Sequence, residues 1–236
     1  EELFAQPYKS MESVKIITLK GGDLNKVACG GVHYMATRDV RYYLCGVHLV
    51  ARNGKLVIEG TDGFSIHQFN SDLELSEGAE NLDVIIPGNA AKAMISIFAD
   101  DEMVEIERVG NQLIGFRTSD AYWVSNMISS KYPDCKNFFL PEVEARQTGV
   151  MMVLPRKNFV AALNRVSSVS LREGNFMRLV FEEKGVKITS TDGEQEDVLI
   201  AAMSSGAVGT FECHVTSAVV INTFDGIPGD HFLISK

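Results

Sequence analysis

The chain has 236 residues, of which 45% are hydrophobic and 22% are charged, and these proportions are ordinary for a globular protein. They exclude collagen, coiled coils and wholesale disorder. No apolar run approaches the roughly 18–20 residues that a bilayer span needs, so we expect no membrane protein. The net charge of −9 argues against a protein that grips nucleic acid over its whole surface, but it is compatible with a local basic patch.

The cysteines form no CxxC pair, and the spacing of Cys29, Cys45, Cys135 and Cys213 fits neither a zinc site nor a dense disulfide framework. We interpret them as buried thiols in a reducing compartment, and we expect no metal and no cofactor. The sequence shows no signal peptide, so a cytoplasmic location is the default expectation. It begins at Glu1 rather than at a methionine, which favours a fragment of a longer protein.

The first half of the chain alternates strands with two amphipathic helices. In chain order, its periodicity predicts a strand over 14–19, a helix over 22–36, strands over 44–50, 56–61 and 82–86, a helix over 87–98, and strands over 103–109, 112–118 and 121–127. Asn53-Gly54 is a hairpin turn signal between two of these strands. On the second helix we expect Ala90, Met94, Ile97 and Phe98 to face inward.

The second half repeats the first. Thr-Asp-Gly occurs at 61–63 and again at 191–193, an offset of 130 residues, and a similar strand pattern precedes both copies. The elements predicted there are strands over 149–154, 176–183, 186–191, 208–215 and 231–235, and helices over 155–168 and 216–224. Phe159, Leu163 and Val166 should share the buried face of the first of these helices.

The repeat also suggests domain boundaries. A polar, acidic segment over 141–149 is typical of a linker, so we expect one domain over 14–141 and a second over 142–236, with 1–13 as a connection from an absent preceding domain. The first half has two more strands after the one that matches 231–235. We therefore expect the native protein to extend beyond Lys236, because a sheet without those strands has an open edge.

No sequence signature of catalysis is present. Walker A, GxGxxG, GxSxG and HExxH motifs do not occur. Asp62 and Asp192 each follow a strand, where a catalytic carboxylate can lie, but Thr-Asp-Gly is also ordinary turn chemistry, and we favour that interpretation. His48 and His67 are interpreted as residues of a strand surface, and the acidic run over 100–102 as a solvated loop.

Several motifs resemble a known family. They occur in order as Asp39-Val-Arg-Tyr-Tyr-Leu-Cys-Gly46, Thr61-Asp-Gly-Phe-Ser-Ile66, Lys131-Tyr-Pro-Asp-Cys135 and Leu140-Pro141. Together they closely resemble the middle domain of the bacterial DNA polymerase III beta subunit, the sliding clamp. The second half is similar to that family's C-terminal domain at Arg156-Lys157, at 162–167, and at 186–189 before Gln195-Glu196, so the resemblance runs from about Val14 to Lys236.

The resemblance implies an α+β fold, the DNA clamp fold, in which repeated domains each pack two helices on antiparallel sheets. It implies a processivity factor that encircles duplex DNA, has no enzymatic activity of its own, and is cytoplasmic and nucleoid-associated. The implied partners are double-stranded DNA, the polymerase catalytic subunit, the clamp loader, repair polymerases and other clamp-binding peptides. The implied assembly is a ring-shaped homodimer with six domains, and the alternative is a trimer of two-domain protomers.

Two sets of site residues follow from the family motifs. The hydrophobic peptide pocket would contain Arg41, Leu44, Thr61, Gly63, Phe64, Ser65, Ile66, Pro133, Asn137 and Phe138. The DNA-facing set would contain Arg38, Tyr42, Tyr43, Lys92, Lys157, Arg165 and Arg172, although one of the two tyrosines can instead belong to the core.

The sequence also departs from the family. Phe64 and Ser65 stand where His-Arg is frequent, Asn137 stands where a basic residue is common, and Pro87-Gly-Asn89 lacks a frequent basic pair. These departures predict a more apolar pocket and a weaker DNA face. One rival interpretation is therefore a clamp-fold docking or regulatory protein that does not encircle DNA, and a more distant one is a hydrolase that uses Asp62.

Overall fold

The computed structural model describes residues 11–139, 151–168, 176–182, 184–190, 196–200, 203–205, 210–217, 220–221, 224 and 230–235. By its internal contacts the chain divides into two compact units, Glu1–Cys135 and Lys136–Lys236, and each is treated separately below. The predicted boundary at 141–142 lies outside the described residues, as do most of 1–13, so both domain limits stay predictions. Among the helices of the described ranges, none has the length and apolar character that a bilayer crossing requires.

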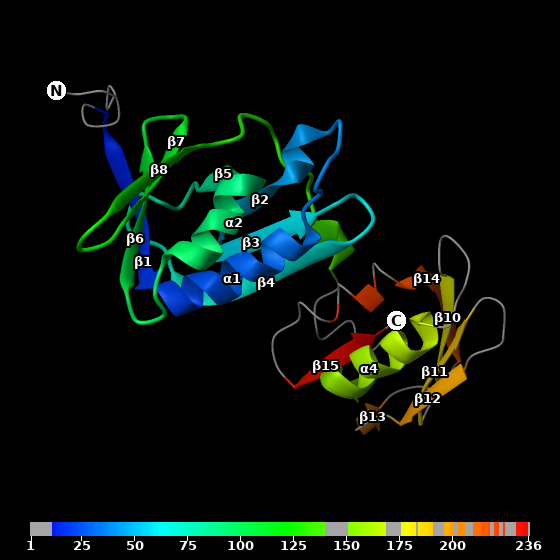
Figure 1. Ribbon diagram of the computed structural model, residues 1–236. Helices are drawn as coiled ribbons and strands as arrows, with labels where there is room; N and C mark the ends of the chain where they lie inside the picture. The colour runs from blue at the N-terminus through cyan, green and yellow to red at the C-terminus, as the bar shows by residue number, and fades with distance from the viewer. Residues whose placement is uncertain are drawn as a thin grey trace. The chain divides into compact units, whose positions relative to one another are not determined.

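The first unit consists of two four-stranded antiparallel sheets and two helices (Figure 1). Its elements are β1 (Ser13–Lys20), α1 (Gly21–Tyr34), η2 (Tyr42–Cys45), β2 (Gly46–Arg52), β3 (Lys55–Thr61), β4 (Ile66–Glu74), β5 (Asp83–Pro87), α2 (Gly88–Ile97), β6 (Met103–Val109), β7 (Leu113–Arg117) and β8 (Tyr122–Asn126). One sheet has the order β4-β3-β2-β5 and the other has the order β1-β6-β7-β8. The two helices lie side by side and contact the first of these sheets.

The core of the first unit joins both sheets to both helices. Ile58, Ile86, Met94, Ile106 and Phe116 come from five different elements, and each is at most 2% exposed. Burial of this apolar surface is the main force that holds the layers together. Ala90 and Met94 on α2, and Phe98 directly after it, are buried as the periodicity predicted, but Ile97 is wrong, since it is 48% exposed in the last turn of the helix.

A close backbone approach fixes α1 on the sheet. A Cβ atom on Gly60 of β3 would lie 2.3 Å from the carbonyl oxygen of Gly31 in α1, so only glycine fits at this crossing. The strand that follows, β4, was not predicted. Its apolar residues Phe69 and Leu73 lie two strand periods apart and pack on the core, but they are only half-buried, and this weakens the alternation that identifies a strand.

The second unit repeats the arrangement of the first. Its described elements are η3 (Lys136–Phe138), β9 (Met151–Pro155), α4 (Arg156–Ser167), β10 (Phe176–Glu182), β11 (Gly185–Ser190), β12 (Glu196–Ile200), β13 (Met203–Ser205), β14 (Phe211–Thr216) and β15 (His231–Ser235). The sheet β12-β11-β10-β14 has the strand order of β4-β3-β2-β5, and β10 and β11 begin 130 residues after β2 and β3. The duplication predicted at this offset is therefore confirmed for the central hairpin.

The remaining predictions for the second unit have mixed outcomes. Phe159, Leu163 and Val166 on α4 are buried, as their helical spacing predicted. The strands β12 and β13 were not predicted. The predicted linker over 141–149, Asp192 and most of the predicted helix over 216–224 lie outside the described residues.

Candidate functional site

The turn after β3 is held by its own side chains. The Thr61 hydroxyl donates to the Ser65 carbonyl at 2.6 Å and accepts from the Gly63 amide at 3.0 Å. Asp62 Oδ1 accepts from the amides of Phe64 and Ser65 at 2.9 and 2.7 Å, and from the Ser65 hydroxyl at 3.0 Å. The interpretation of Asp62 as a turn residue is confirmed by these contacts, and the hydrolase alternative gains no support from this geometry.

Arg41 lies against this turn. Its Nε and Nη2 atoms donate to the two carboxylate oxygens of Asp39 at 3.0 and 2.8 Å, a bidentate pair that fixes the plane of the guanidinium. The Arg41 side chain and amide lower the pKa of Asp39 to about 2, so the carboxylate stays ionised at neutral pH. The same guanidinium fills the space beside Gly63, whose φ is +90°.

Three exposed side chains with large apolar surface are neighbours in sequence of Arg41 or of Gly63. Val40 is 97% exposed, Tyr42 is 57% exposed and Phe64 is 91% exposed. We define the Arg41 patch as Arg41, Val40, Tyr42 and Phe64. It offers large apolar surface next to a fixed cation on a turn whose backbone is restrained, which suits a peptide with apolar anchors.

The other predicted pocket residues have different environments. Leu44 and Thr61 are 1% and 3% exposed in the free chain, and their role as pocket residues stays a prediction. Ser65 and Ile66 are half-buried, and Gly63 and Pro133 are exposed. Asn137 and Phe138 are exposed on η3, which belongs to the second unit, and they stay predictions as pocket residues.

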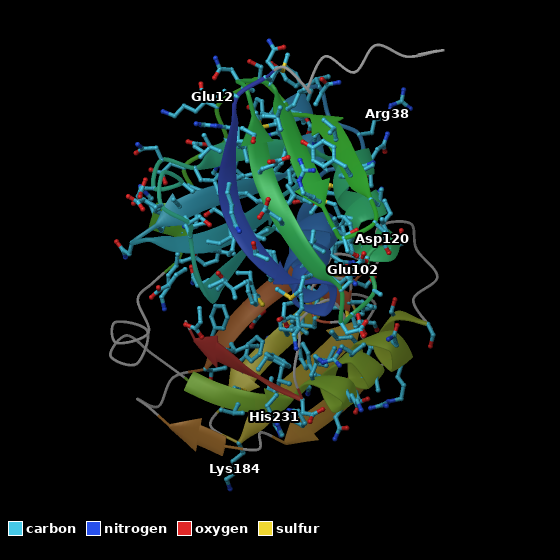
Figure 2. All side chains as sticks on the ribbon, turned by 90° about the vertical axis from the view of Figure 1, so that its left-hand side faces the viewer. Glu12, Arg38, Glu102, Asp120, Lys184 and His231 are labelled. Carbon is cyan, nitrogen blue, oxygen red and sulfur yellow. The ribbon has the colours of Figure 1, made fainter. Side chains whose placement is uncertain are left out.

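The predicted DNA-facing residues also differ in their exposure and in their contacts. Arg38, Tyr42, Lys92 and Lys157 are exposed, and the Arg38 side chain stands clear of the ribbon in Figure 2. Tyr43 is half-buried and packs on Ile85, Tyr132 and Cys135, so it belongs partly to the core. Arg165 forms an ion pair with Asp197 on β12, with its Nη2 atom 2.6 Å from Oδ2. Arg172 lies outside the described residues.

A buried polar row was not foreseen from the sequence. His48 is 5% exposed and Glu59 is fully buried, so the interpretation of His48 as a strand-surface residue was wrong. The cause is the segment 127–135, which covers the face of the sheet that points away from the helices.

His67 is half-buried and stacks on Tyr34, with ring centroids 4.8 Å apart, and burial lowers its pKa. The prediction of buried thiols holds for Cys135, whereas Cys45 and Cys213 are only half-buried.

A cavity of about 490 Å³ lies elsewhere on the first unit. Its lining comes from Asp83, Val84, Asn111, Gln112 and residues 127–131, and includes none of the predicted pocket residues. Within the described parts of the chain, no group of three or more His, Cys, Asp or Glu side chains is placed to hold a metal ion.

Comparison with known proteins supports the resemblance over the first unit. Residues 23–134, which contain the Arg41 patch and the turn after β3, match the family described as DNA polymerase III beta subunit, central domain. The first unit therefore resembles the central domain of this family. The beta sliding clamp of Staphylococcus epidermidis is 28% identical over 163 residues, which are 68% of this chain and 41% of that protein. The family resemblance expected from the motifs is thus confirmed.

Solved structures of sliding clamps share the fold. DNA polymerase III subunit beta from Pseudomonas aeruginosa matches 93% of this chain and 58% of its own, at 20% identity and a TM-score of 0.81. The sliding clamp from Bacillus subtilis matches 99% of this chain and 60% of its own, at 18% identity and a TM-score of 0.81. Both units therefore have the clamp fold, and the chain spans less than two thirds of these relatives.

Proposed function

We propose that the chain acts as part of a DNA sliding clamp, a non-catalytic processivity factor that docks short hydrophobic peptides of polymerases, clamp loader and repair proteins at the Arg41 patch. The observation that carries this proposal is the 91% exposed Phe64 on a restrained turn beside Arg41, within the domain that matches the family. Apolar side chains of this size are normally buried, so their exposure on a fixed backbone favours a binding surface.

The energetics suit a short peptide. Covering a phenylalanine side chain removes apolar surface worth about 2 kcal/mol from water, and Val40 and Tyr42 add to this. The bonds of Asp62 and Thr61 already restrain the turn, so little conformational entropy is lost when a peptide binds. Phe64 and Ser65 replace the basic residues that are frequent here, which favours peptides with an additional apolar side chain over acidic ones.

The proposed relation to DNA is encirclement with weak phosphate contacts. The exposed Arg38, Lys92 and Lys157 lie on or next to helices, and a ring needs only weak contacts of this kind because it is retained topologically. We propose a homodimeric ring in the bacterial cytoplasm at the nucleoid, with a trimer of two-domain protomers as the alternative. Related clamps from Bartonella birtlesii and Pseudomonas aeruginosa were solved bound to griselimycin, which supplies a second probe.

Fluorescence polarisation tests the docking proposal. The probe is a fluorescein-labelled peptide from the C-terminal tail of a bacterial replicative polymerase, with unlabelled griselimycin as competitor. We expect Phe64→Asp to abolish binding, because a peptide would have to bury an unpaired charge. Phe176→Asp is the matched control, since Phe176 is also an exposed aromatic residue but lies on β10 of the second unit. Unchanged affinity in Phe64→Asp would remove the Arg41 patch from the binding site.

The rival function, docking without encirclement, is supported by the apolar replacements at the patch and by the sparse basic residues on α1 and α2. Light scattering across a concentration series, together with retention on circular and linear DNA, separates the two. A dimer or trimer retained only on circular DNA supports encirclement. A monomer that binds the peptide but is not retained on either DNA supports the rival.

A further inference from the structure

A polar row crosses the sheet β4-β3-β2-β5 on the face opposite the helices. Glu59 on β3 is the direct cross-strand partner of both His48 on β2 and Gln68 on β4. We define the polar row as these three residues, together with Arg52 and Asp83, which bond to its members. Such a row is unusual because Glu59 is fully buried, and a buried carboxylate is costly unless its oxygens are satisfied.

The oxygens of Glu59 are satisfied from three directions. Oε1 accepts from Arg52 Nη2 at 2.6 Å and from Gln68 Nε2 at 3.2 Å, and Oε2 lies 2.9 Å from His48 Nδ1. The other ring nitrogen of His48 lies 2.9 Å from Asp83 Oδ1. With a carboxylate at each nitrogen, the imidazole ring is held in one plane across the sheet.

A segment that covers this face of the sheet packs on the His48 ring. We define the strap as residues 127–135, which follow β8 without helix or strand and run over this face of the sheet. The Tyr132 ring stacks on His48, with centroids 4.5 Å apart and an angle of 22° between the planes. The Ile128 amide donates to the Ile85 carbonyl at 2.9 Å, and Cys135 at the end of the strap is 1% exposed.

Tyr132 works through its ring rather than its hydroxyl. The residue is 4% exposed, and burial raises its pKa. By geometry, the hydroxyl has no hydrogen-bond partner among the residues that the structure describes. Loss of the hydroxyl should therefore cost little, whereas loss of the ring should release the strap.

The strap also supports the candidate binding site. Tyr132, Cys135 and Ile85 form one buried cluster, and Tyr43 and Ile66 pack against it. Tyr43 follows Tyr42 of the Arg41 patch, Ile66 ends the turn that carries Phe64, and Pro133 is part of the strap. The same small cluster therefore lies beneath the Arg41 side and the Phe64 side of the proposed docking surface.

We propose that His48 and Tyr132 are positioning residues for peptide docking: the polar row fixes the His48 ring, the ring seats the strap, and the seated strap holds the Arg41 patch in its binding geometry. This inference rests on the proposed peptide-docking function. None of the residues of the polar row was among the predicted pocket residues, and neither His48 nor Tyr132 needs to touch the peptide.

Two measurements on the full chain test the proposal. The rate of Cys135 alkylation by iodoacetamide, measured by mass spectrometry, reports whether the strap is seated, and Cys213 in the second unit is the internal control. Polarisation of the labelled polymerase-tail peptide reports docking. For Tyr132→Leu we expect Cys135 alkylation and the peptide Kd to rise at least about tenfold, which for the Kd equals about 1.4 kcal/mol. Cys213 alkylation should stay unchanged.

Two control variants separate positioning from general stability. Tyr132→Phe keeps the ring and should match the wild type in both measurements. Phe116→Leu destabilises the main core of the same unit, which is a different cluster from the one that holds Tyr132 and Cys135, and it should leave the Kd within about twofold. His48→Leu should reproduce Tyr132→Leu, because it removes the stacked ring and leaves Glu59 with Arg52 and Gln68.

The outcomes distinguish the inference from the function on which it rests. If Tyr132→Leu exposes Cys135 but binds the peptide as the wild type does, the positioning role is overturned while the docking function stands. If Phe116→Leu weakens binding as much as Tyr132→Leu does, the effect is one of stability alone and the inference fails. If the wild type binds neither the peptide nor griselimycin, the proposed function fails and the inference falls with it.

Discussion

The guanidinium of Arg41 occupies the space that a side chain on Gly63 would need. A Cβ atom at Gly63 would lie 2.7 Å from Arg41 Nη2 and 3.0 Å from Nη1. Asp39 bonds to Nε and to the same Nη2, so the guanidinium cannot move away without breaking a bidentate pair. The turn and the Arg41 side chain thus pack together and form one surface, although more than twenty residues separate them in the sequence.

Gly63→Ala should destabilise the first unit by more than the cost of its backbone conformation. Gly54→Ala is the matched control, because Gly54 also has a positive φ but a Cβ atom there would meet nothing within 4 Å. We expect Gly54→Ala to cost about 1–2 kcal/mol. Gly63→Ala should cost more, and Arg41→Ala combined with it should remove the excess. Thermal unfolding measures all three, and equal losses for the two single variants would contradict the contact.

Leu44 and Phe64 should separate stability from binding. Leu44→Ala removes a side chain that is 1% exposed and should cost about 2–5 kcal/mol in the free energy of unfolding. Phe64→Ala removes an exposed side chain and should change that free energy by less than about 0.5 kcal/mol, while it weakens peptide binding. Urea unfolding and polarisation give both values. Loss of stability in Phe64→Ala would mean that the ring packs on the domain.

Cys135 should make the first unit sensitive to alkaline pH. Burial, with the nearby charge of Glu59, raises the pKa of its thiol to about 11. The folded state therefore holds this proton more tightly than the unfolded state, whose thiol titrates near its ordinary pKa of about 8.5. The resulting stability is fully present below about pH 8.5 and is lost as the pH rises through about 11.

Urea unfolding at about pH 7.5 and about pH 10.5, on either side of the ordinary thiol pKa, measures this effect. The wild type should lose more stability between the two pH values than Cys135→Ala does. The raised pKa of Tyr132 acts in the same direction, so the variant should keep part of the dependence. An identical loss in both proteins would show that the thiol titrates normally.

On α4, Lys157 should matter more for DNA than Arg165. Both are exposed, but the charge of Arg165 is balanced by Asp197, whereas Lys157 has no ion pair among the residues that the structure describes. Lys157→Glu should weaken binding to a labelled duplex at low salt and reduce the salt dependence, since fewer counterions are released. Arg165→Glu should have the smaller effect. Lys184→Glu, in the turn between β10 and β11 (Figure 2), is the control and should bind as the wild type does.

The sequence by itself determined the repeated fold. Strand and helix periods, the Asn53-Gly54 turn and the offset between the two Thr-Asp-Gly motifs depend on local geometry, and local geometry is encoded by neighbouring residues. The resemblance to the sliding clamp family followed from short motifs in the same way. The strand β4 was missed because its inward residues include the polar Ser71 beside the half-buried Phe69 and Leu73, so its sequence shows little apolar alternation.

Only the tertiary structure decided which of the site residues are available. The sequence analysis interpreted His48 as a strand-surface residue, and the face of a sheet that points away from the helices usually faces water in a two-layer domain. Whether that face is open depends on the strap, which joins the sheet from more than seventy residues later in the chain. The same holds for the ion pair of Arg165 with Asp197, for the burial of Leu44, and for the contact of Arg41 with Gly63. Each depends on segments that are distant in sequence and that packing brings together. A pattern of neighbouring residues cannot predict such contacts.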